Sequence, residues 1–226
     1  MNMKPMFDFL KTELPPQAEE QFATYCENLL ETNKVMNLTA INDPDEVFVR
    51  HFYDSIAIMQ FVSFQNKSVI DVGCGAGFPG LPLKLANPSI SLTLLDSLDK
   101  RIRFLSDLCA ELNLSDVSCI HGRAEEFSKT DARESFDFAV SRAVAALPML
   151  CELCLPFVKV GLFPIGDLFL PGQQQKALCG HQFLQHKALR RGGKLSALRR
   201  LRLHSLPHAL RLVPIKLLHI HRFLSF

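Results

Sequence analysis

The sequence lacks several features that would place it in a specialised class of protein. It has no tryptophan, and its 11 glycines and 13 prolines are too few for a collagen-like or low-complexity chain. No uninterrupted apolar run reaches the ~18 residues that cross a bilayer, and Asp8 interrupts the short apolar stretch near the start. We therefore expect a cytoplasmic protein with no membrane partner.

The cysteines do not form the pattern of a disulfide framework. There are seven of them, an odd number, at irregular spacings, which favours a reducing compartment. Cys151-x-x-Cys154 has no second pair at the spacing of a zinc site. We expect no metal.

Acidic residues are scarce in one part of the chain. Residues 1–160 hold 14 basic and 22 acidic residues, a net charge of −8, whereas residues 161–226 hold 11 basic residues and one acidic residue, Asp167, a net charge of +10. The overall charge of +2 therefore hides two unlike parts. The length of 226 residues suits one α/β domain with an extension.

Two amphipathic helices are predicted before the first strand, over residues 16–34 and 43–60. Asp43 can cap the second helix, Pro44 suits its first turn, and Glu46 completes a capping box. His51 and Asp54 lie three apart on this helix, and we interpret them as a pair or a cap within it. The two helices form an N-terminal helical cap.

From residue 67 onward, strands alternate with helices. Strands are predicted over residues 67–72, 91–95, 117–121 and 136–141, with a fifth over 157–163, and helices over 81–85, 100–113 and 147–155. This alternation predicts an α/β fold, a doubly wound, Rossmann-like parallel sheet with the ligand crevice at the carboxyl ends of its strands.

A glycine-rich turn follows the first strand, with the pattern Asp71-x-Gly73-x-Gly75-x-Gly77. Gly75-x-Gly77-x-x-Gly80 also fits a dinucleotide-binding turn, and both types of site expect an acid such as Asp96 at the end of the second strand. A pyrophosphate needs amides at the start of the helix, and Pro79 lacks one. The turn therefore favours S-adenosylmethionine (SAM), a cationic cofactor without phosphate.

Residues after the third and fourth strands also fall at the expected cleft. Ala124 and Glu125 follow the third strand, although Glu125 could equally be a solvated helix start. Arg142 ends the fourth strand, where it could serve the site or pair with a surface acid.

Taken together, these motifs resemble the RsmG (GidB) family, the bacterial 16S rRNA guanine-N7 methyltransferases. The resemblance covers about residues 20–160. It is carried by six motifs in order: Asn37-Leu-Thr-Ala-Ile41 with Asp43-Pro44, Val49-Arg-His-Phe52 with Asp54-Ser55, the loop from Asp71 to Lys84, Leu94-Leu-Asp-Ser97 with Lys100-Arg101, Arg123-Ala-Glu-Glu126, and Ser141-Arg142-Ala143.

The resemblance implies a SAM-dependent methyltransferase fold and methyl transfer to N7 of one guanine in 16S rRNA of the small ribosomal subunit. Separately, we expect a monomer. Carried over by position, the SAM contacts would be Gly73, Phe78, Ala124, Glu125 and Arg142, with Asp96 and Ser97 beside the ribose or adenine, and Gly75 and Gly77 completing the turn. Arg142 is the residue assigned to catalysis, as a group that orients cofactor or RNA.

The resemblance stops near Val160, where the composition also changes. We hypothesise a frameshift near the codon for Gly161, which would leave the last strands of the sheet missing. The rival interpretation is a basic extension that binds RNA phosphates, and a membrane-surface helix over residues 195–212 is a third. The predicted division is a helical cap over 1–62, a SAM-binding core over 63–160 and a basic tail over 161–226.

Two other functions remain open at this point. The chain could be an inactive or destabilised remnant that binds SAM or RNA without turnover, or an NAD-binding oxidoreductase on the same winding. An rRNA enzyme with an acidic core would need local basic groups, and the candidates are Lys100, Arg101, Arg103, Arg123 and Arg142.

Overall fold

The computed structural model of the chain describes residues 14–160 and 176–179. The helical cap comes first, with α2 over Ala18–Met36, α3 over Pro44–Val47, the π-helix η1 over Phe48–Tyr53, α4 over Asp54–Ile56 and the 3-10 helix η2 over Ala57–Gln60. The core continues with β1 Ser68–Val72, α5 Gly80–Ala86, β2 Ser91–Asp96, α6 Asp99–Glu111, β3 Val117–His121, α7 Ala124–Phe127, β4 Phe138–Arg142, α8 Leu147–Cys154, η3 Leu155–Phe157 and β5 Lys176–Cys179.

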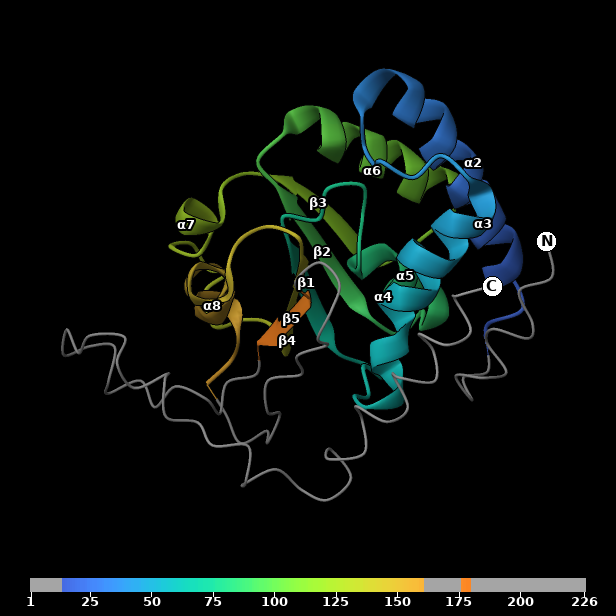
Figure 1. Cartoon of the computed structure of the whole chain (residues 1–226). Helices are drawn as coiled ribbons and strands as arrows, with labels where there is room; N and C mark the ends of the chain where they lie inside the picture. The colour runs from blue at the N-terminus through green and yellow to red at the C-terminus, as the bar shows by residue number, and fades with distance from the viewer. Residues whose placement is uncertain (1–13, 161–175, 180–226) are drawn as a thin grey trace, which may run out of the picture. The chain divides into compact units, whose positions relative to one another are not determined.

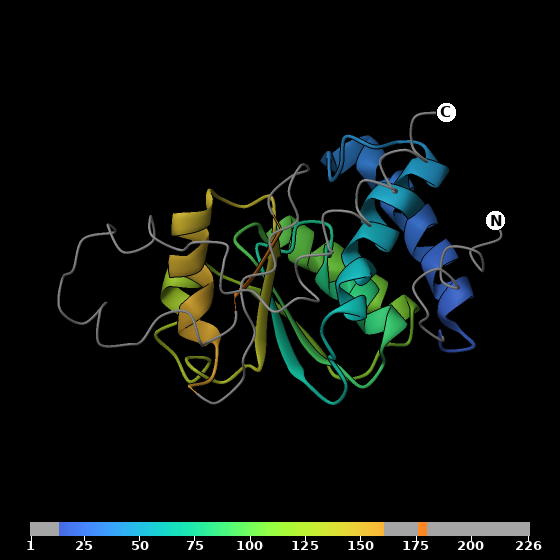
Figure 2. The same cartoon turned by 60° about the horizontal axis from the view of Figure 1, so that its bottom comes forward.

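These elements form one sheet with helices on both faces. The strand order is β3-β2-β1-β4-β5, and the first four strands are parallel. Helices α5, α6 and the cap cover one face, and α7 and α8 cover the other (Figures 1 and 2). The predicted α/β fold with an N-terminal helical cap is confirmed.

Alternate residues of β1 belong to two separate apolar clusters, one on each face of the sheet. Val69 packs with the cap, α5 and α6, whereas its neighbour Ile70 packs with α8 and η3 on the opposite face. Side chains of a strand alternate between faces, and a strand buried on both faces reads as the continuous apolar run seen here. The cap belongs to the larger cluster through buried aromatic rings, among them Phe22, Tyr25 and Phe52.

The second cap helix begins as the sequence predicts but changes its winding. Asp43 Oδ1 accepts a hydrogen bond from the Glu46 amide at 3.0 Å, and Pro44 takes the first helical position. Residues 44–60 then pass through α, π, α and 3-10 segments, where the sequence predicts one uniform helix. A π-turn inserts one residue into the ladder, and such turns occur often at functional sites.

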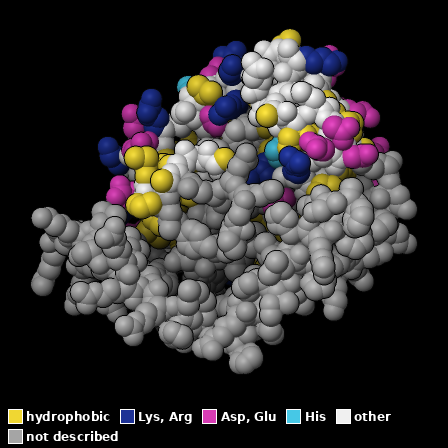
Figure 3. Space-filling model, in the orientation of Figure 1, with side chains coloured by type: hydrophobic (Ala, Val, Ile, Leu, Met, Phe, Trp, Pro, Cys, Tyr) yellow, Lys and Arg dark blue, Asp and Glu magenta, His cyan; other side chains and the backbone are white. Residues whose placement is uncertain are grey.

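The described surface mixes charges of both signs. Figure 3 shows basic side chains scattered among acidic ones on the face drawn. Several of them form ion pairs, including Arg103 with Asp99 at 2.7 Å and Arg50 with Glu46 at 3.5 Å. No helix among the described residues is long and apolar enough to cross a bilayer.

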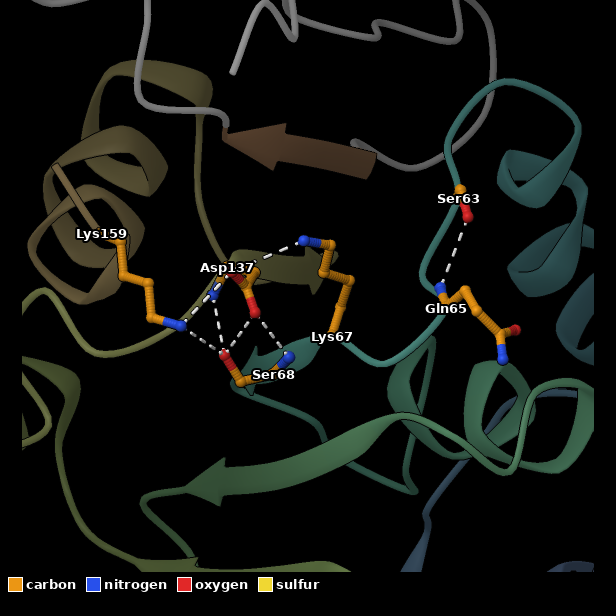
Figure 4. A network of polar contacts seen from close by, with 6 residues as sticks. All are labelled: Ser63, Gln65, Lys67, Ser68, Asp137 and Lys159. Carbon is orange, nitrogen blue, oxygen red and sulfur yellow. Dashed lines mark hydrogen bonds and ion pairs between the residues drawn. The ribbon is translucent and has the colours of Figure 1, made fainter. Parts of the chain in front are cut away.

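A polar clamp fixes the amino end of the sheet (Figure 4). Asp137 Oδ2 accepts hydrogen bonds from both the amide and the hydroxyl of Ser68 at 2.9 Å, and Lys159 Nζ lies 3.3 Å from Asp137 Oδ1. Burial acts to raise the pKa of Asp137, but the bonds from Ser68 and Lys159 outweigh it and lower that pKa. The clamp sets the register of β1 against β4 and leaves the carboxyl ends of both strands for a site.

Two features near the end of the described chain differ from the sequence prediction. The strand expected over residues 157–163 is reduced, in its described part, to a single bridge between Val158 and Phe136. A strand that the sequence analysis did not predict, β5, pairs antiparallel with β4. Residues 161–175 and 180–226, which hold most of the predicted basic tail, lie outside the described residues.

Replacing Gly80 by Ala should destabilise the protein by about 1–3 kcal/mol, the usual cost of overpacking. A Cβ at Gly80 would lie 2.8 Å from Asp71 Oδ2 and 3.1 Å from Leu92 Cδ1, so β1 or α5 must move. Urea unfolding measures the change in the free energy of unfolding.

Gly122→Ala is the matched control, because the nearest atom to its Cβ is 3.7 Å away, an ordinary contact. Equal unfolding midpoints for the two variants would contradict the close packing of α5 on β1.

Candidate functional site

The glycine-rich turn after β1 is hydrogen-bonded to the end of β2. The amides of Gly73 and Cys74 donate to Leu95 O at 2.8 and 3.1 Å, and the Gly75 amide donates to Asp96 Oδ2 at 2.9 Å. Gly73, Gly75 and Gly77 have φ of 70°, 60° and 104°, a conformation that side chains rarely adopt. The turn and Asp96, predicted from their spacing, are thus brought into direct contact.

The three glycines of the turn have different surroundings. A Cβ at Gly73 would lie 2.4 Å from Val144, on the loop after β4, and one at Gly77 would lie 2.7 Å from Tyr25 Oη. No described atom lies within 4 Å of the position of a Cβ at Gly75. Gly73 and Gly77 therefore serve close packing, and the backbone at Gly75 faces open space.

Asp71 lies buried beneath this turn. Its Oδ2 accepts a hydrogen bond from the Gly80 amide at 2.7 Å, while its Oδ1 is buried with no hydrogen-bond partner among the described residues. Burial raises the pKa of Asp71 to about 7, although the Gly80 amide and the charge of Arg142 act in the opposite direction. The carboxylate is an incompletely satisfied acceptor, which a further positive charge above the turn would stabilise.

The carboxylate of Asp96 already holds three donors. Oδ1 accepts from the Leu98 amide at 2.9 Å, and Oδ2 accepts from Arg101 at 3.3 Å as well as from Gly75. Ser97 follows as an exposed residue whose carbonyl lies 3.1 Å from His121 Nε2. The side chain of Arg101 is partly exposed, and the turn itself is held by the backbone amides of Gly73, Cys74 and Gly75.

Arg142 lies at the end of β4, and its side chain is only 8% exposed. Its guanidinium carbon lies 4.5 Å from the centroid of the Phe78 ring, close enough for a cation–π contact. Burial lowers the pKa of Arg142 to about 10, with Tyr25 and Asp71 acting against that shift. Arg142 does pair with an acid, the partly exposed Asp54, but its own side chain is largely buried.

The polar partners of Arg142 come from the cap. Its NH2 group lies 3.0 Å from His51 Nδ1, and its NH1 group lies 3.4 Å from Arg50 O and 3.7 Å from Asp54 Oδ2. Whatever contacts they make within their own helix, His51 and Asp54 both reach Arg142 at the end of β4, which the sequence analysis did not predict. Their spacing places both on one helix face, but nothing in the sequence shows that β4 ends opposite that face.

Ala124 and Glu125 begin α7, one strand further along the sheet. The amide of Gly122 donates to Asp96 O at 3.0 Å, which ties this loop to the end of β2. Ala124 is half-buried and Glu125 is exposed. Phe78, by contrast, is buried at the centre of an aromatic group with Tyr25 and His51.

Among the described residues, no group of three or more His, Cys, Asp or Glu side chains is arranged to hold a metal ion.

Replacing Asp71 by Asn should change how stability depends on pH. Between the ordinary pKa of 3.8 and the value of about 7 in the folded protein, the folded state holds a proton that the unfolded state has lost. The free energy of unfolding of the unmodified protein should therefore gain a falling component as the pH rises from about 4 to about 7, and Asp71→Asn should lack it.

Urea unfolding of both proteins between pH 4 and pH 8 tests this expectation, because the groups remote from Asp71 contribute equally to the two curves. Parallel curves would show that Asp71 ionises normally in the fold.

Comparison with known proteins identifies the family of the chain. Residues 18–176 match the family model described as GidB, rRNA small subunit methyltransferase G. The protein named ribosomal RNA small subunit methyltransferase G from Macrococcus caseolyticus is 51% identical over 150 residues, which cover 66% of this chain and 63% of that protein. Proteins of the same name from Bacillus cytotoxicus and Alkaliphilus oremlandii are 52% and 53% identical, over 63% and 64% of their lengths.

The matched part therefore spans less than two thirds of these relatives. Among solved structures, a SAM dependent methyltransferase from Aquifex aeolicus aligns with 39% of this chain and 46% of its own chain, at 20% identity and a TM-score of 0.33. The assignment rests on the family model and the sequence relatives: the chain belongs to the GidB family, rRNA small subunit methyltransferase G.

Proposed function

We propose that the chain transfers a methyl group from SAM to N7 of a guanine in 16S rRNA, acting as a cytoplasmic monomer on the small ribosomal subunit. The observation that carries the proposal is the bond between the Gly75 amide and Asp96, which joins the glycine-rich turn to the next strand in a member of this family. This is the crevice at the carboxyl ends of parallel strands where such sheets bind their ligands.

The residues of the crevice fit a cationic cofactor. The open space at Gly75 admits a ligand close to the backbone, and Asp71 below it carries an unpartnered carboxylate oxygen. Pro79 stands at the start of α5, which removes an amide that a pyrophosphate would use. This observation favours SAM over NAD.

The proposed SAM-binding residues surround that space. Gly75 would lie against the cofactor, Asp96 and Ser97 would take its ribose or adenine, and Arg142 would fix its position from β4. The complete proposed set is Gly73, Gly75, Gly77, Phe78, Asp96, Ser97, Ala124, Glu125 and Arg142. When bound, the cofactor supplies an electrophilic methyl group.

The proposed reaction depends on the positioning of guanine N7 against the methyl group more than on proton transfer. Guanine N7 carries a lone pair and no proton, so no general base is needed. The protein has to align N7 with the methyl group and exclude water. The guanine gains positive charge, so a bare cation close to it would oppose the reaction. Arg142 meets this constraint, because Phe78 and Asp54 lie against its charge.

Residues 1–160 carry a net charge of −8, so attraction of RNA to this part of the chain has to come from local basic groups. Of the basic groups predicted to help, Arg101 and Arg103 are paired with Asp96 and Asp99, and Arg142 is buried. Lys100 and Arg123 are exposed beside the crevice-forming loops, so we assign the first contact with phosphates to them.

A remnant that binds SAM without turnover is the second candidate, because the match to the family model ends at residue 176 and the relatives are covered over less than two thirds of their length. We retain the hypothesis of a frameshift near Gly161 and the division into residues 1–62, 63–160 and 161–226. Resequencing the gene tests the frameshift, and an intact reading frame through Phe226 would refute it.

One experiment separates the candidate functions. The purified full chain is incubated with labelled SAM and small ribosomal subunits that lack the modification, and SAM and NAD are titrated by calorimetry. Methyl incorporation at guanine N7 supports the proposal, SAM binding without transfer supports the remnant, and NAD binding supports the oxidoreductase.

Arg142→Ala should lower methylation roughly a hundredfold or more, the scale of effect when the reacting groups are misaligned. The protein should remain folded, because the substitution removes no apolar side chain from either cluster. Initial rates and a thermal melt measure the two effects, and unchanged turnover would remove Arg142 from the site.

Gly75→Ala should weaken SAM binding by roughly tenfold or more, since the added Cβ occupies the open space and strains a backbone with φ of 60°. Calorimetry with SAM measures it. Gly122→Ala serves as the control, and equal affinities for the two variants would place the cofactor elsewhere.

A further inference from the structure

The partners of His51 link the cap to Arg142 in a single chain of contacts. His51 Nε2 lies 2.8 Å from Thr39 Oγ1, and His51 Nδ1 lies 3.0 Å from the NH2 group of Arg142. The ring of His51 also stacks on Phe78, with centroids 4.5 Å apart and planes inclined by 22°. One imidazole therefore contacts a loop of the cap, the glycine-rich turn and the end of β4.

The direction of these hydrogen bonds follows from the groups involved. A guanidinium can only donate, so Nδ1 of His51 must accept and carries no proton. A neutral imidazole then has its proton on Nε2, which donates to Thr39 Oγ1. The hydroxyl oxygen of Thr39 also accepts from the Ile41 amide at 3.1 Å, which agrees with its role as acceptor.

Thr39 is itself held in place. The buried Asn33 on α2 accepts from the Thr39 amide at 2.8 Å and donates to Thr39 O at 2.9 Å and to Asn42 Oδ1 at 2.8 Å. These bonds fix the loop that contains the segment from Asn37 to Ile41. This polar segment lies outside the crevice, but through Thr39 and His51 it is connected to Phe78 of the glycine-rich turn.

The winding of the cap helix brings a second acceptor to Arg142. The π-helix η1 contains both Arg50 and His51, and Arg50 O accepts from the NH1 group of Arg142 at 3.4 Å. On the other side, Ala143 has φ of 58°, a strained value for a residue with a side chain. Strain of this kind persists only where the surroundings fix the backbone. The direction of the Arg142 side chain is therefore set by the backbone at Ala143 and by the acceptors on the cap.

We propose that His51 is a positioning residue, which uses its unprotonated Nδ1 to hold the Arg142 guanidinium against Phe78. This inference rests on the proposed function for its effect on methylation. His51 touches neither the cofactor nor the reacting atoms in this account. It acts by holding Arg142 in place and by connecting the cap to the end of β4.

The proposal predicts a dependence on pH. Among the described residues, the titratable groups that act on Arg142, the partner of His51, include Asp54 on α4, Tyr25 on α2 and Asp71 on β1, while Arg50 on η1 contributes its backbone carbonyl. A second proton on His51 would point an N–H at the guanidinium and place two cations in contact. Methylation should therefore fall on the acid side as His51 becomes protonated, and this limb should vanish in a variant that cannot protonate.

The test compares three variants of the full chain. His51→Asn keeps an acceptor near the position of Nδ1 that does not titrate, His51→Phe keeps the stacking on Phe78 without an acceptor, and Lys34→Ala is a surface control on α2. His51→Phe should lower kcat roughly ten- to a hundredfold, as expected for the loss of a hydrogen bond to a charged group. His51→Asn should restore most of kcat and lose the acid limb, and Lys34→Ala should match the unmodified protein.

A second readout does not need activity. Nitrogen NMR of histidine-labelled protein, with the His51 signals assigned by their loss in His51→Asn, should show Nδ1 unprotonated and Nε2 protonated at pH 7.5. Arg142→Ala should shift the Nδ1 signal. If the unmodified protein does not methylate, the proposed function fails, and NMR still decides the inference. A protonated Nδ1, or equal kcat for His51→Asn and His51→Phe with intact thermal melts, would overturn it.

Discussion

Three consecutive amides of the turn after β1, those of Gly73, Cys74 and Gly75, donate to the last two residues of β2. This row of hydrogen bonds requires positive φ angles that glycine adopts at little cost, and it draws the backbone down onto the edge of the sheet. Asp71 lies buried in β1 between β2 and β4, just before this turn, and no described atom lies near a Cβ placed on Gly75. The clamp of Ser68 and Asp137 at the opposite end keeps β1 and β4 aligned, so that Arg142 comes up beside the same turn.

The cap completes the site as well as covering the sheet. Its aromatic residues belong to the same apolar cluster as β1 and β2, which makes the cap part of the fold. That packing brings the face of η1 and α4 to the end of β4, where the cap supplies the acceptors for a buried guanidinium. A buried charge needs such partners, because an unpaired one would be strongly destabilising.

The sequence predicted most of the framework because its signals are local. The alternation of apolar runs located four strands to within two residues, and the Asp43 cap follows from a short-range pattern. The sequence placed Asp96 at the end of β2 but did not predict its bond to the Gly75 amide, 21 residues away. Contacts that depend on the angle between cap and sheet were not predictable in this way. His51 and Asp54 were assigned to each other because the sequence contains no sign of Arg142 opposite them. The four-residue strand β5 is too short for a recognisable period.

The carboxylate of Asp96 determines both the shape of the turn and the chemistry that the turn presents to a ligand. The same oxygens that fasten the turn and hold Arg101 are those that a ribose would need. Any change at this position alters the shape of the turn together with the chemistry presented to a ligand. The geometry of the turn and the ligand preference of the proposed site are therefore coupled through one side chain, and a substitution of Asp96 cannot change one and leave the other as it was.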